Sequence, residues 1–152
     1  TDVLDEIGDQ LPLNIEIKDA DAVDAVVSIL KTFAHCQTLI SSFSASAVAH
    51  AARVKSSIPR AWISGDLPAS DKDQAASKWP FGELVNTRAS RWHTSVWFCN
   101  PMTIALLSAR GIETHVWTVN SVELASRLSV IGVHGIFTDR PGELRTRMPE
   151  LN

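Results

Sequence analysis

The stretch LNIEIK at positions 13–18 decides the fold class of this chain of 152 residues. Apolar and polar residues alternate along it, and the side chains of a β-strand alternate between its two faces. Glu16 and Lys18 therefore share one face, roughly 6–7 Å apart along the strand. A carboxylate and an ammonium at the end of a buried strand indicate a metal ion, a bound anion or an ion pair between the two.

Helix signals separate this strand from further strand-like stretches. Those stretches lie near residues 37–41, 61–64, 89–93, 113–119 and 135–139. Ser44 is a plausible N-cap, Asn100 is followed by a first-turn proline, and Asn120 with Glu123 resembles a capping box. Six strands separated by helices predict an α/β fold of parallel βαβ units with right-handed crossovers. Six such units suit either an open doubly wound sheet or part of a barrel. Because a complete (β/α)8 barrel takes about 250 residues, such a barrel would be a partial one here.

The whole chain, residues 1–152, reads as a single domain with one irregular excursion at residues 65–88. We expect a loop with one or two short helices there. Trp79 and Phe81 would be core anchors or walls of a ligand pocket. The tail from Arg140 onward is expected to be short and polar.

Composition limits the partners and the compartment. The formal charge of −3 and the lack of a Lys/Arg cluster argue against nucleic-acid binding. No apolar run approaches the roughly 20 residues of a transmembrane helix, and the acidic start has no signal-peptide pattern. Cys36 and Cys99 read as buried thiols, which favours a cytoplasmic location, or a periplasmic one if a signal was removed.

The remaining candidate residues have structural as well as functional interpretations. Trp117 could form the apolar wall of a small-ligand site at the carboxyl end of its strand, or it could be a core residue. His93, placed at a strand end, is the histidine to test for function; the other four histidines read as structural. A Gly-x-Ser-x-Gly nucleophile motif is absent from the sequence.

Several of these stretches together resemble one known family, the glycerophosphodiester phosphodiesterases. Its Asn-Ile-Glu-Ile-Lys strand resembles residues 14–18, and its Ser-Phe turn resembles ISSF at 40–43. Its closing signature resembles VWTVN at 116–120 and GVHGIFTDRP at 132–141. The resemblance covers nearly the whole chain in the right order.

The resemblance implies a TIM-type barrel that hydrolyses glycerophosphodiesters to glycerol 3-phosphate and an alcohol, with a divalent metal, calcium or magnesium. It implies that Glu16 is a metal ligand and that Lys18 is a catalytic residue that neutralises the phosphate. Trp117 would line the glycerol side of the pocket, and Phe43 would lie at the pocket edge. A cation and a positive side chain both stabilise the charge that develops on a phosphoryl group.

The family's His-Arg-Gly, Glu-x-Asp and His-Asp motifs do not occur in this sequence. By this correspondence the chain holds strands three to eight of the barrel. We therefore expect the chain alone to be inactive, and a second copy or a missing N-terminal segment to complete the barrel. Two alternatives stay open: a non-catalytic fragment that binds or assembles, and a phospholipase resembling sphingomyelinase D.

Overall fold

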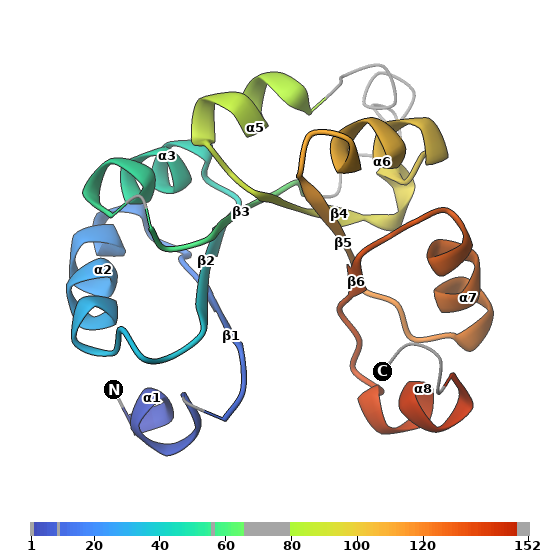
Figure 1. Cartoon of the computed structure of the whole chain (residues 1–152), viewed down its shortest axis with the longest axis horizontal. Helices are drawn as coiled ribbons and strands as arrows, with labels where there is room; N and C mark the ends of the chain where they lie inside the picture. Colours follow the sequence, from blue (N-terminus) through green and yellow to red (C-terminus); the bar gives the residue numbers. More distant parts are fainter. Residues whose placement is uncertain (1, 9, 56, 66–79, 149–152) are drawn as a thin grey trace. The chain divides into compact units, whose positions relative to one another are not determined.

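The computed structural model describes residues 2–8, 10–55, 57–65 and 80–148. Strands and helices alternate along it (Figure 1), which confirms the α/β class and the six strands. The chain divides into two compact units: residues 1–63 with 80–91, and residues 64–79 with 92–152. Each unit is described separately below, and the single domain over residues 1–152 stays a prediction.

The first unit contains three strands and most of the helices that follow them. Its elements are α1 (Asp2–Ile7), β1 (Leu13–Glu16), η1 (Ala20–Ala22), α2 (Val23–Thr32), β2 (Thr38–Ser42), α3 (Ala45–Val54), β3 (Arg60–Ile63) and α5 (Phe81–Thr87). The strands pair in parallel in sequence order, with Glu16 opposite Ser41 and Ser41 opposite Ala61. Helix α5 lies inside the expected excursion at 65–88, whereas Trp79 falls outside the described residues.

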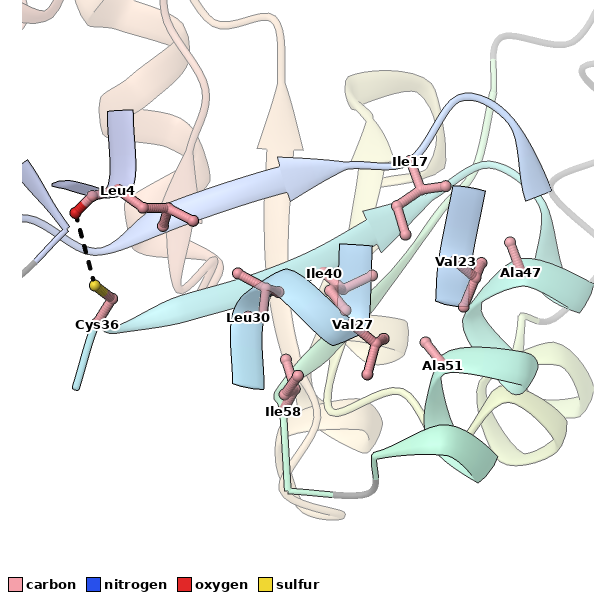
Figure 2. Packing of buried hydrophobic residues seen from close by; sticks show 10 residues of the cluster. All are labelled: Leu4, Ile17, Val23, Val27, Leu30, Cys36, Ile40, Ala47, Ala51 and Ile58. Atoms are coloured by element: carbon pink, nitrogen blue, oxygen red, sulfur yellow. Dashed lines mark hydrogen bonds between the residues drawn. The ribbon is translucent and has the colours of Figure 1, made fainter. Parts of the chain in front are cut away.

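One face of this sheet packs against helices. Figure 2 shows Ile17 and Ile40 pointing toward side chains of α2 and α3, among them Val27 and Ala51. Since strand side chains alternate, Glu16 and Ser41 point to the opposite face. The alternation predicted from residues 13–18 is therefore confirmed, although β1 ends at Glu16 and leaves Lys18 beyond the strand.

A buried guanidinium donates hydrogen bonds to the main chain of two loops in this unit, one before β3 and one after α5. Arg60, the first residue of β3, donates hydrogen bonds to the carbonyl oxygens of Lys55 (3.5 Å) and Arg88 (3.2 Å), and also to that of Ile58. Burial, and then the positive charge of Arg88, lower the pKa of Arg60. Residue types alone do not predict these hydrogen bonds of Arg60, because the acceptors are main-chain atoms.

The second unit repeats the same βα plan. Its elements are β4 (Arg91–Ser95), η3 (Val96–Phe98), α6 (Pro101–Ser108), β5 (Glu113–Trp117), α7 (Val122–Val130), β6 (Gly135–Ile136) and α8 (Pro141–Arg147). Strands β5 and β6 are parallel, and Val116 and Ile136 face a core that includes Leu128 and Leu144. The neighbouring side chains His115 and Trp117 alternate with Val116 in β5.

The short polar tail after Arg140 forms α8, a helix that was not predicted, which buries Leu144 and leads into the buried Met148. One local prediction for this unit was wrong. The N-cap of α7 is Ser121, whose hydroxyl accepts from the Leu124 amide at 3.1 Å, and not Asn120. No helix among the described residues is long and apolar enough to span a bilayer.

Candidate functional site

In the first unit, the structure brings together three of the predicted site residues. The Lys18 ammonium lies 2.5 Å from Oε1 of Glu16 and 5.7 Å from the centroid of the Phe43 ring. Lys18 is thus placed between a carboxylate and an aromatic face, both of which attract a cation. Its side chain is still 76% exposed, against 30% for Glu16, so a ligand has access to the ammonium.

The main chain fixes the two segments that carry these residues. The Ile17 amide donates to the Ser41 carbonyl at 2.8 Å, and the Ser42 hydroxyl donates to the Ile17 carbonyl at 2.7 Å. The same Ser42 oxygen accepts from the Ser44 amide, and Ser44 caps α3 as predicted. The chain is therefore held on both sides of Phe43, whose side chain is 47% exposed at the end of β2.

The described residues supply one carboxylate to this cluster rather than a complete metal site. Calcium takes six to eight oxygen ligands, and magnesium takes six. Within residues 2–8, 10–55, 57–65 and 80–148, no group of three or more His, Cys, Asp or Glu side chains could hold a metal ion. Oε1 of Glu16 is also engaged by Lys18. These residues alone do not fit a divalent cation.

In the second unit, Trp117 is the last residue of β5, and its side chain is partly buried. His115 lies two residues earlier on the same strand face, with Nε2 3.4 Å from Oε2 of Glu113. The His115 ring packs closely over β6, because a Cβ added to Gly135 would lie 3.2 Å from its Nδ1 atom. A larger residue at position 135 would require the His115 ring to shift by a few tenths of an ångström.

His93 does not lie at a strand end as predicted. It is the third residue of β4 and is 1% exposed, so it cannot meet a ligand at the surface. Its ring stacks on the His115 ring, with the two centroids 5.2 Å apart. It also makes an edge-to-face contact with the Phe137 ring, with the centroids 4.8 Å apart. The sequence shows the histidines but not this ring cluster, since the three residues come from three separate segments.

Cys99 gives a first testable prediction. Burial raises the pKa of its thiol to about 12, and Sγ lies 3.8 Å from the Ser95 carbonyl. Because the thiolate is the reactive form, Cys99 should resist alkylation by iodoacetamide near pH 8 in the folded chain and react once urea unfolds it. Peptide mapping by mass spectrometry reads out the modified residue. Fast alkylation of Cys99 in the folded chain would contradict this result.

A comparison with family models matches residues 3–143 to the family described as "Glycerophosphoryl diester phosphodiesterase family". A curated relative, "Probable glycerophosphodiester phosphodiesterase 2" of Mycobacterium tuberculosis, is 26% identical over 148 residues. The alignment covers 88% of this chain and 53% of the relative, so the chain spans about half the length of that protein.

Solved structures of similar proteins show the same fold. A protein from Silicibacter pomeroyi that carries the family's name matches with a TM-score of 0.82 and 25% identity, over 99% of this chain and 54% of that one. A phosphodiesterase from Oleispira antarctica, solved with the product sn-glycerol 3-phosphate, matches with a TM-score of 0.77 and 21% identity, over 97% and 58%. The six strands thus correspond to part of the barrel of these proteins.

Proposed function

The chain belongs to the glycerophosphoryl diester phosphodiesterase family, and from this membership we propose that it takes part in the hydrolysis of glycerophosphodiesters. In that reaction, water adds to phosphorus, the bond from phosphorus to the alcohol oxygen breaks, and glycerol 3-phosphate and the alcohol leave. A divalent cation, calcium or magnesium, would supply charge neutralisation. The described residues would contribute the Glu16 carboxylate to such a site.

The observation that carries this proposal is the Lys18 ammonium, held by Glu16 and Phe43 yet largely open to solvent. A compact, exposed positive charge suits a phosphate oxygen. Separately, for the second unit, the resemblance predicts that Trp117 lines the glycerol side of a ligand, and an indole gives a large apolar surface. The glycerol 3-phosphate bound in the Oleispira antarctica structure supports the same chemical class of ligand.

A binding test separates the phosphate contact from the glycerol contact. We expect Lys18→Met to weaken the binding of both sn-glycerol 3-phosphate and inorganic phosphate about tenfold, the size of one charge-assisted hydrogen bond. Trp117→Ala should weaken the binding of sn-glycerol 3-phosphate but not that of inorganic phosphate, because inorganic phosphate has no carbon backbone. Calorimetric or NMR titration with each ligand measures the two dissociation constants.

Lys31→Met is the matched control for this titration, because Lys31 is another exposed lysine, in the last turn of α2. It should bind both ligands as the parent chain does. Equal losses in the Lys18 and Lys31 variants would show that overall charge, and not the Lys18 position, determines binding. Absence of any saturable binding by the parent chain would refute the proposed function.

A second candidate function is binding without turnover. It is favoured by one observation. Within the described part of the chain, Glu16 does not belong to a group of three or more His, Cys, Asp or Glu side chains that could hold a metal ion. Binding of sn-glycerol 3-phosphate with no hydrolysis of a glycerophosphodiester would support this alternative for the chain by itself.

A further inference from the structure

Asn120 does not perform the role that its sequence position suggests. The spacing to Glu123 predicts a helix cap, but the neighbouring Ser121 caps α7. The Asn120 side chain instead turns toward the segment that follows β6. The Asn120 residue is partly buried there.

All these contacts go to two consecutive residues. Oδ1 of Asn120 accepts from the Asp139 amide at 2.9 Å and from the Thr138 hydroxyl at 3.1 Å. Nδ2 of Asn120 donates to Oδ2 of Asp139 at 2.9 Å. The Thr138 oxygen in turn accepts from the Arg140 amide at 3.0 Å. We call the contacts among Asn120, Thr138 and Asp139 the rim network.

The rim network follows directly on the stretch of chain that contains Trp117, which is itself hydrogen-bonded to the segment after β6. The Phe137 amide donates to the Val116 carbonyl, and the Val119 amide donates to the Phe137 carbonyl, both at 2.8 Å. Trp117 therefore lies between two main-chain bonds to the segment after β6, and Asn120 adds side-chain bonds one residue further on. A hydrogen bond between an amide and an ionised carboxylate is stronger than one between two neutral groups.

We infer that Asn120 is a positioning residue, which through Asp139 holds the segment of Trp117 in the geometry that contacts the glycerol part of the ligand. This inference rests on the proposed function for the ligand, but the position of Trp117 can be measured without one. The two side chains also permit an exchange. In the exchanged pair, the carboxylate of Asp at position 120 can still accept from the main-chain amide of residue 139 and from the Thr138 hydroxyl. The side-chain N–H of Asn at position 139 can donate to that carboxylate.

The test compares Asn120→Asp with the exchanged pair Asn120→Asp/Asp139→Asn in the full chain. The single variant places two carboxylates together, and like charges repel. We expect the indole N–H signal of Trp117, assigned by its loss in Trp117→Phe, to shift in the single variant. Hydrogen exchange at the residue-139 amide should accelerate, and affinity for sn-glycerol 3-phosphate should fall about tenfold, as for one charge-assisted hydrogen bond. The exchanged pair should restore all three.

Ser121→Ala is the control for general loosening, because it removes the α7 cap next to Asn120 without touching the rim network. It should leave the Trp117 signal and the exchange at residue 139 unchanged. The inference is overturned if Asn120→Asp leaves the Trp117 signal in place, if the exchanged pair does not restore it, or if Ser121→Ala shifts it equally. If the Trp117 signal responds as expected but no variant binds sn-glycerol 3-phosphate, the proposed function is refuted instead.

Discussion

Incubated with a glycerophosphodiester and magnesium or calcium, the chain of 152 residues is expected to release no measurable glycerol 3-phosphate. Hydrolysis in this family requires charge neutralisation and a positioned proton donor. The described residues offer Glu16 as one carboxylate at the candidate site, and the sequence has no His-Arg-Gly, Glu-x-Asp or His-Asp motif. Since enzymes accelerate such reactions by at least about 10⁶-fold, the missing groups should bring turnover below detection.

The measurement is an enzymatic assay for released sn-glycerol 3-phosphate, with the Oleispira antarctica phosphodiesterase as the positive control. Glu16→Gln decides the meaning of any signal, because it keeps the shape of the side chain and removes its charge. Release that scales with the amount of chain and disappears in Glu16→Gln would contradict the expected inactivity. Release that persists in this variant would not depend on the Glu16 carboxylate.

The alternation in residues 13–18 was enough to predict the faces of β1, because burial on one face of a strand leaves a period of two in the sequence. The caps at Ser44 and Asn100 were also predictable, since each acts on its own helix within three residues. The approach of Lys18 to Phe43 was not, because it depends on the pairing of β1 with β2. Local signals thus fixed the elements and left the contacts between them open.

The cap of α7 shows why a local pattern can mislead. Asn120 and Ser121 are both good N-cap residues, and Glu123 suits a capping box with the first. The choice is made by Asp139, which lies 19 residues away and takes the Asn120 amide. Helix α8 is a similar case, because its few apolar residues are sufficient only when Leu144 packs against the core around Val116.

Arg60→Met is expected to lower the free energy of unfolding by about 2 kcal/mol, as read from urea denaturation. Two effects compete. Loss of the guanidinium leaves the buried Ile58 carbonyl without its donor and removes two part-buried bonds, to Lys55 and Arg88. Against this, methionine relieves the desolvation of a buried cation. The hydrogen bonds should outweigh this relief, because an unpaired buried carbonyl alone costs about 1–3 kcal/mol.

Two further variants make this prediction specific to the buried group. Arg53→Met, at an exposed arginine in the last turn of α3, should change stability by less than about 0.5 kcal/mol. Arg88→Gly should stabilise the chain by about 1 kcal/mol. Arg88 has a φ of +50°, which glycine adopts more readily, and its positive charge repels that of Arg60. The Arg88 carbonyl that binds Arg60 is retained in glycine. Equal stability of Arg60→Met and the parent chain would mean that the desolvation of the guanidinium cancels its hydrogen bonds.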